Sequence, residues 1–190
     1  VGEIGASYIP GHAHADTFNF EFRIGGRPFI VDVGTSTYEA GEKRDFERST
    51  KAHNIVEINS ENSSEVWGGF RVANRARVTE LVETIDHIKS THDGYKKKFG
   101  ILHTREWVFE EEKITINDSL NKRCNATARL HFHPDITEEE IFKRIKIQNS
   151  KFRIQNYNYA TEFNKTTSAI CIETEFFNTS HIEITTKGIQ

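Results

Sequence analysis

The sequence contains no methionine and only two cysteines, Cys124 and Cys171, among its 190 residues. The two cysteines lie in separate strand-like segments; they could pair, but their spacing indicates neither a disulfide framework nor a metal-binding motif. We expect two reduced thiols that face the core. Because the chain starts at Val1 and lacks methionine throughout, we expect it to be a piece of a longer protein. Its first residues do not form a signal peptide, which leaves the location of the longer protein open.

The chain also has no excess of positive charge: it contains 25 lysines and arginines and 28 aspartates and glutamates, which give a net charge of −3. Proteins that bind nucleic acid are usually basic, so this class is disfavoured. No apolar run approaches the roughly 20 residues of a membrane-spanning helix. A composition of 36% hydrophobic and 28% charged residues is typical of a globular chain, and we expect one domain over residues 1–190.

Short strand-like segments, about twelve in number, follow one another along the chain without sustained helical periodicity. Gly25-Gly26 and Asp93-Gly94 are typical hairpin turns between such segments. The pattern predicts an all-β fold, an antiparallel β-sandwich. It also predicts a long polar loop over residues 34–50 and one strand over residues 70–81. Thr137–Glu140 is compatible either with one capped helical turn or with the approach to another strand, and the sequence leaves this choice open.

His12, His14 and Asp16 alternate directly before a run in which apolar residues alternate from Phe18 to Ile24. If one strand covers the whole stretch, the two histidines and the carboxylate lie on the same inward face as the apolar side chains. Each buried ring nitrogen needs a partner, so this pattern favours a metal or catalytic site over two hydrogen-bonded core histidines.

Asp32 lies inside the apolar run Phe29–Val33, where an isolated carboxylate would cost several kcal/mol unless a cation, a metal or several donors accompany it. An alternative is a carboxylate that accepts hydrogen bonds from the turn at Gly34. His53 opens a further strand-like run. Two histidines and one aspartate with an open position form a common set of ligands for zinc or a similar divalent ion.

The segments GHAHADTFNFEF, FIVDVGTSTYE, RSTKAHNIVEI, SEVWGGFRVANRARV and HDGY occur in this order. Together they resemble the C-terminal domain of the heparinase II/III-like polysaccharide lyase family, closely over residues 3–135 and loosely beyond. The resemblance implies a β-sandwich that follows an N-terminal helical toroid domain, and a divalent metal, most simply zinc, in the sandwich. By motif, the metal ligands are His14, Asp32 and His53, and the active-site histidine is His12.

The resemblance further implies cleavage of a uronic-acid-containing glycan by β-elimination. The acidic polysaccharide would be the substrate, and the catalytic tyrosine and the carboxylate-binding Asn or His would come from the toroid domain. The chain alone would then be catalytically incomplete, and the parent would be periplasmic or extracellular. The candidates for substrate contact within this chain are Tyr38, Arg48, Asn54, His92 and Tyr95.

Two other classes of function stay open at this point. Cupin-like metal enzymes also carry His-x-His on a strand, but Glu21 lies seven residues after His14 and has the opposite parity. A noncatalytic glycan-binding or assembly module is the other alternative, and an arginine stripe at positions 71, 75 and 77 would favour it, although such a stripe more often faces solvent. His131 and His133 form a second His-x-His pair, which we interpret as outward-facing or hydrogen-bonded.

Overall fold

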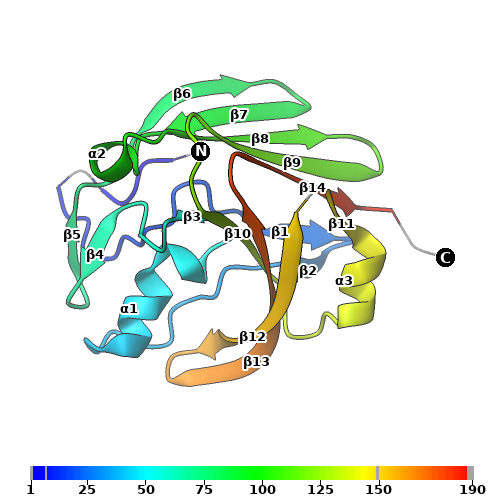
Figure 1. Cartoon of the computed structure of the whole chain (residues 1–190). Coiled ribbons are helices and arrows are strands. Elements are labelled where there is room, and N and C mark those ends of the chain that lie inside the picture. Colours follow the sequence, from blue (N-terminus) through cyan, green and yellow to red (C-terminus); the bar gives the residue numbers. More distant parts are fainter. Residues whose placement is uncertain (1, 7, 149, 188–190) are drawn as a thin grey trace.

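The structure is a computed structural model that describes residues 2–6, 8–148 and 150–187. Strands dominate, and the helices are short (Figure 1). In chain order the elements are β1 (Phe22–Ile24), β2 (Arg27–Ile30), α1 (Glu42–Arg48), the 3-10 helix η1 (Thr50–Ala52), β3 (Val56–Ile58), β4 (Glu65–Trp67), β5 (Arg71–Ala73), β6 (Val78–Glu83), β7 (His87–His92), α2 (Lys96–Phe99), β8 (His103–Phe109), β9 (Lys113–Leu120), β10 (Ala126–His131), α3 (Glu138–Arg144), β11 (Ile145–Gln148), β12 (Lys151–Glu162), β13 (Lys165–Phe176) and β14 (Thr179–Thr185).

Two antiparallel sheets form the body of the molecule. A six-stranded sheet has the order β11-β14-β9-β8-β7-β6, and a four-stranded sheet has the order β12-β13-β10-β3. Figure 1 shows the six-stranded sheet lying across the top of the molecule, with α1 and the long β12–β13 hairpin below it. The prediction of an antiparallel β-sandwich is confirmed. In the described part of the chain, none of the helices has the length and apolar composition needed to span a membrane.

The core lies between the two sheets. Trp107, Ile116 and Ile184 reach it from the six-stranded sheet, while Leu130 and Ile172 reach it from the four-stranded sheet. These side chains belong to the alternating apolar positions of their strands, as expected for sheets with one buried face. The core therefore follows directly from the period-two pattern of the sequence.

The β1–β2 hairpin brings the predicted site to the end of the four-stranded sheet. Gly25 and Gly26, with φ of 58° and 82°, form its two-residue turn, as the sequence predicted. Backbone bonds from Val31 N to His131 O (2.9 Å) and from His133 N to Phe29 O (3.0 Å) then place β2 beside the end of β10. Asp32 follows directly after this contact.

Three predictions about secondary structure were wrong. The strand expected over residues 12–24 is reduced to β1, because the chain turns at Asp16–Asn19, where Asn19 N donates to Asp16 O (2.8 Å) and Phe18 has φ of 74°. The polar loop over residues 34–50 contains α1. The strand over residues 70–81 is divided into β5 and β6 around Asn74, whose φ is 40°.

Several smaller features agree with the sequence analysis. Thr137 caps α3 by accepting a hydrogen bond from Glu140 N (3.2 Å), and β11 follows, so the helical turn and the strand both occur. Both cysteines are free thiols; Cys171 is buried and Cys124 is partly buried. The arginine stripe agrees only in part: Arg71 and Arg77 are exposed, whereas Arg75 is partly buried and donates to the carbonyl oxygens of Ile4 and Ala6 (both 3.0 Å), which holds the N-terminal segment.

A chain of buried polar groups crosses the six-stranded sheet near the site. Gly94 N donates to His92 Nδ1 (3.1 Å), His92 Nε2 lies 2.9 Å from His103 Nδ1, and His103 Nε2 lies 2.7 Å from Asp118 Oδ1. Arg105 Nε donates to the same Asp118 oxygen at 2.7 Å. Burial alone would raise the pKa of Asp118, but Arg105 and His103 together hold it well below its usual value. Asp118 is therefore an ionised carboxylate that neutralises a buried arginine.

The buried Asp118–Arg105 pair yields a prediction about stability. Asp118→Ala leaves the guanidinium without its counter-charge, and we expect it to lower the free energy of unfolding by about 3–5 kcal/mol, as for other broken buried pairs. Urea unfolding followed by circular dichroism measures this. Glu139→Ala, which removes an exposed pair with Lys143, is the matched control and should leave the midpoint nearly unchanged. Equal effects of the two substitutions would contradict the assignment.

Candidate functional site

The segment that carries His12 and His14 is held in place by Arg48 of α1. Arg48 is completely buried, and its guanidinium donates to Ala13 O from both Nε (3.2 Å) and Nη2 (2.9 Å). It also donates to the carbonyl oxygens of Trp67 (3.3 Å) and Arg71 (3.2 Å), and Ala15 N donates to Arg48 O (2.9 Å). Since all of these partners are backbone groups, Arg48 fixes the path of the irregular segment in place of strand pairing.

Asp32 and His53 form the centre of the site. His53 Nδ1 lies 2.7 Å from Asp32 Oδ2, and Asn19 Nδ2 donates to the same oxygen. Gly34 N donates to Asp32 Oδ1 (2.8 Å), so the carboxylate has donors on both oxygens. Burial alone would raise the pKa of Asp32, but His53 and the bond from Gly34 lower it to about 2. Asp32 is thus ionised, and the turn contact with Gly34, one alternative from the sequence, is present. His53, predicted as a second ligand of the same metal, here bonds directly to Asp32.

His53 Nε2 is the free end of this arrangement. The imidazole is 1% exposed, and within the described part of the chain its Nε2 has no hydrogen-bond partner. A neutral ring that donates through Nδ1 to Asp32 carries its lone pair on Nε2. A buried polar atom without a protein partner is uncommon and points to a bound water, an ion or a functional role.

His14 lies beside His53, with 5.3 Å between the ring centroids. Burial, followed by the nearby His53 and Arg44, lowers the pKa of His14 from 6.5 to about 3. Arg44 Nη1 lies 3.3 Å from His14 Nε2 and donates to it, because the guanidinium has only donors. His14 is therefore neutral and already has a partner on Nε2.

The predicted ligands His14, Asp32 and His53 thus gather in one place. Within residues 2–6, 8–148 and 150–187, however, no three His, Cys, Asp or Glu side chains are arranged closely enough to hold a metal ion. The donor set still fits a divalent metal chemically: one ionised carboxylate, one neutral imidazole and one buried, unpartnered imidazole nitrogen. Metal binding would require the groups to draw together and His14 to exchange its bond with Arg44 or to use Nδ1.

His12 does not lie on the buried side with His14. His12 lies in a turn in which Ala13 N donates to Pro10 O (2.9 Å), so no strand aligns its side chain with that of His14, and His12 is exposed. Its ring lies 5.6 Å from that of Tyr38 and 5.4 Å from that of Phe70, both edge-to-face. The prediction of a shared face was wrong for His12, which lies at the surface next to the buried centre.

Of the five residues predicted to contact substrate, only Tyr38 has an exposed side chain. Asn54 is buried and donates to Phe20 O and Val31 O, both at 2.9 Å. Tyr95 is buried, and its hydroxyl donates to Val56 O (2.8 Å). His92 belongs to the buried polar chain, and Arg48 binds backbone carbonyls. The prediction that these two residues, Asn54 and Tyr95 contact substrate is therefore corrected: all four are buried and stabilise the fold.

The second His-x-His pair is hydrogen-bonded, as interpreted from the sequence. His131 is buried, and its Nδ1 lies 3.3 Å from Asn54 Oδ1. His133 is partly exposed, and its Nδ1 accepts from Asp135 N (3.3 Å). Burial lowers the pKa of His131 to about 3, so its ring is neutral.

Three residues at the site were missed from the sequence. Asn19, which holds Asp32, stands in the apolar run as an ordinary polar position of a strand. Arg44 lay in the expected loop, and Phe163 stands at the far end of the β12–β13 hairpin, 5.8 Å from the Tyr38 ring. The sequence contains one indication of Phe163: an aromatic residue stands between two polar residues, Glu162 and Asn164, where a surface turn would leave it exposed.

Comparison with solved structures places this two-sheet sandwich among known folds. A heparan sulfate lyase, HepC from Pedobacter heparinus, superposes with a TM-score of 0.70 at 17% identity, over 94% of this chain and 32% of that chain. A structure titled heparinase III, BT4657 gene product, has a TM-score of 0.65 at 14% identity and matches 92% of this chain and 30% of that chain. Another structure titled heparinase III has a TM-score of 0.68 at 12% identity and matches 94% of this chain and 31% of that chain. The chain thus spans about a third of the length of these neighbours. The search of curated proteins returned no match.

The fold and the site define a β-sandwich domain with a histidine- and carboxylate-lined centre next to an exposed histidine. The sequence profile of the family "Heparinase II/III-like, C-terminal" matches residues 1–186. The chain belongs to this family, as the resemblance in the sequence implied.

The low pKa values predict how acid affects the metal-free protein. Between pH 6.5 and 3 the unfolded chain binds protons at His14 and His131 that the folded chain does not, so the free energy of unfolding should fall as the pH falls. The slope is up to about 1.4 kcal/mol per pH unit for each group. Asp32 adds a loss only below its unfolded value of 3.8.

Urea unfolding of chelator-treated protein at several pH values between 7 and 4 tests this. His14→Gln removes one titrating group and should flatten the dependence, whereas His181→Gln, a partly exposed histidine on β14, should retain it. A dependence that is identical in wild type and His14→Gln would contradict the assignment of a neutral His14.

Proposed function

We propose that this chain is the β-sandwich part of a polysaccharide lyase that cleaves a uronic-acid-containing glycan by β-elimination. The observation that carries the proposal is the exposed His12 next to Tyr38, two residues from a buried centre of His14, Asp32 and His53 in which one imidazole nitrogen is unpartnered. The family supports this reading, and the neighbours titled as heparan sulfate lyases make heparan sulfate a candidate substrate. We further propose a periplasmic or extracellular location.

In β-elimination, a base removes the proton from the carbon next to the uronate carboxylate, and the glycosidic oxygen on the neighbouring carbon leaves. The reaction needs a base, neutralisation of the carboxylate and a proton for the leaving oxygen. His12 suits the role of base or of an assisting group, because its side chain is exposed and has ring partners that fix its position. Tyr38 places a hydroxyl-bearing ring beside it, 5.6 Å away between ring centroids. The remaining groups would come from a helical toroid domain, and the sandwich alone would be inactive.

The metal belongs to the same proposal. A bound divalent ion, with zinc the first candidate, would be held by His14, Asp32 and His53 and would supply a fixed positive charge beside the glycan site. The orientation of these ligands is set by the chain itself: Asn19 and Gly34 bind Asp32, and Arg48 binds the backbone between His12 and His14. In this arrangement His14 anchors the segment whose neighbour, His12, faces the substrate.

Two alternatives arose from the sequence. Membership of the heparinase-like family and the two-sheet sandwich remove the cupin-like enzyme. Glu21 also has another role, since its Oε1 accepts from Asp32 N (3.2 Å). A noncatalytic glycan-binding module is the second candidate. The two candidates are distinguished by the product, because such a module binds the glycan without releasing an unsaturated uronate.

Metal content is the first prediction from this proposal. Protein purified without chelator should contain one divalent ion per chain by elemental analysis, and Asp32→Ala and His53→Ala should each reduce the metal content by at least about tenfold. His133→Ala, in the other His-x-His pair, is the control that should retain the metal. Wild-type protein that stays metal-free after dialysis against zinc would remove the metal from the proposal.

The role of His12 gives the second prediction. In the intact protein, His12→Ala should lower kcat on a uronate glycan by about 10²- to 10⁴-fold, the usual contribution of a general base, and leave the metal content unchanged. Ultraviolet absorbance of the unsaturated uronate measures the rate. His87→Ala on the six-stranded sheet is the control. If His12→Ala also releases the metal, His12 is a metal ligand and the assignment of roles is wrong.

A further inference from the structure

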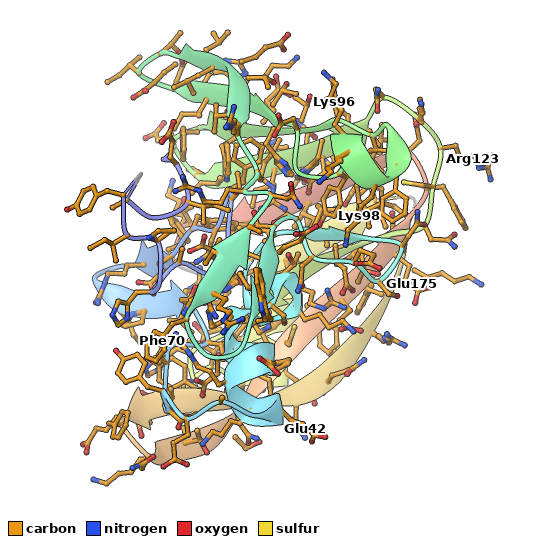
Figure 2. All side chains as sticks on the ribbon, turned by 90° about the vertical axis from the view of Figure 1, so that its left-hand side faces the viewer. Glu42, Phe70, Lys96, Lys98, Arg123 and Glu175 are labelled. Carbon is orange, nitrogen blue, oxygen red and sulfur yellow. The ribbon has the colours of Figure 1, made fainter. Side chains whose placement is uncertain are left out.

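Four rings from four distant parts of the sequence gather on the surface at His12. We define His12, Tyr38, Phe70 and Phe163 as the aromatic platform. The Tyr38 ring lies 5.9 Å from Phe70, nearly parallel at 24°, and 5.8 Å from Phe163. The His12 ring contacts both Tyr38 and Phe70 edge-on. Figure 2 shows Phe70 at the β4–β5 turn, pointing outward from the body of the molecule.

The β12–β13 hairpin is attached so that Phe163 reaches this surface. Ala160 N donates to Val33 O (2.9 Å), and Asn164 N donates to Ser36 O (2.7 Å). Gly34 permits the approach, because a side chain there would come within 3.1 Å of the Ala160 Cβ atom. The end of the hairpin is thus joined to the backbone that directly follows Asp32, and Phe163 is held close to Tyr38.

The platform is unusually exposed for a set of large rings. The exposed fraction is 45% for Tyr38, 47% for Phe70 and 56% for Phe163. Single exposed aromatic residues are common, but contiguous ones beside a polar site are typical of binding surfaces. Exposed aromatic rings can stack on the C–H face of a sugar ring.

A buried positive charge lies directly beneath the platform. The Arg44 guanidinium carbon is 5.2 Å from the Tyr38 ring centroid, and the residue is fully buried. Its hydrogen-bond partners in the described part of the chain are neutral groups: Gly69 O, Thr35 and His14. Arg44 Nη2 has no partner there. Among the described residues no carboxylate forms an ion pair with Arg44; Glu47 on the same helix acts on its charge from farther away. A guanidinium without a paired carboxylate gives this surface a preference for an acidic ligand.

We propose that the aromatic platform binds one pyranose ring of the acidic glycan, next to the sugar from which His12 removes a proton, and that Phe70 and Phe163 select its shape. Stacking requires a ring face that carries only C–H groups. A β-linked glucuronate, whose ring substituents are all equatorial, has such faces, whereas a guluronate has axial oxygens. The platform therefore favours glucuronate-containing glycans over guluronate-containing ones. This inference rests on the proposed lyase function.

The test compares Phe163→Ala and Phe70→Ala with Phe152→Ala in the intact protein. Phe152 is the matched control, because its side chain is also 45% exposed but lies on another surface. There its ring centroid is 6.2 Å from that of Phe142. On a glucuronate-containing oligosaccharide we expect KM to rise by about 3- to 10-fold for each platform variant, the size of one lost ring contact, with kcat within about twofold. The ratio of kcat/KM for glucuronate over guluronate substrates should fall equally.

Calorimetric binding of the unsaturated oligosaccharide product should show the same loss of affinity, independently of turnover. If the wild-type protein cleaves the glycan and Phe163→Ala and Phe70→Ala behave like Phe152→Ala, the platform is overturned and the lyase function stands. A lower melting temperature without a change in KM would show that the rings cover another part of the protein, and this also overturns it. A wild-type protein that neither cleaves nor binds an acidic glycan means that the proposed function itself has failed.

Discussion

The hydrogen bond between His53 Nδ1 and Asp32, 2.7 Å long, is the contact on which the rest of the site depends. It joins the end of the β1–β2 hairpin to the segment that enters β3. Because it uses the Nδ1 hydrogen and the carboxylate together, it fixes both the ring orientation and the position of the Nε2 lone pair. Asn19 and Gly34 complete the donors around Asp32, so the carboxylate stays charged although it is largely buried.

Two buried arginines fix the groups between this hydrogen bond and the protein surface. Arg48 binds the backbone on which His12 and His14 stand, and Arg44 binds His14 and lies under Tyr38. Both are presented by one short helix, α1, whose buried side consists of charged residues. The sandwich core gives the domain its stability, while this polar layer shapes the surface next to it. A binding surface can therefore vary without disturbing the packing between the sheets.

The sequence predicted the sandwich because the strands of the core alternate with period two and the β1–β2 turn carries Gly-Gly. Asp93-Gly94, expected at a hairpin tip, instead precedes α2. It also brought His14, Asp32 and His53 together, because the motifs resemble those of the family. It failed at α1, since a helix that buries Arg44, Glu47 and Arg48 has no apolar periodicity to read. It failed again for His92 and Tyr95, whose burial depends on hydrogen-bond partners that are distant in sequence.

The conformation of His12 shows a third limit. Alternation placed it on the inner face with His14, but His12 lies in the turn Pro10–Ala13, which leaves it at the surface. Pro10-Gly11 was a signal for this turn. The later turn at Asp16–Asn19 contains a left-handed Phe18, a conformation that cannot be read from the residue type.

We propose that His53 Nε2, which has no hydrogen-bond partner in the described part of the chain, anchors a metal centre beside His12. Crystals grown with zinc and measured at the zinc absorption edge test this proposal. We expect one anomalous peak about 2.0–2.1 Å from a nitrogen of His53 and of His14, and within about 2.2 Å of an Asp32 oxygen, with His12 outside the ligand set. A peak bound by His12 or by His131 and His133, or no peak near His53, would contradict it.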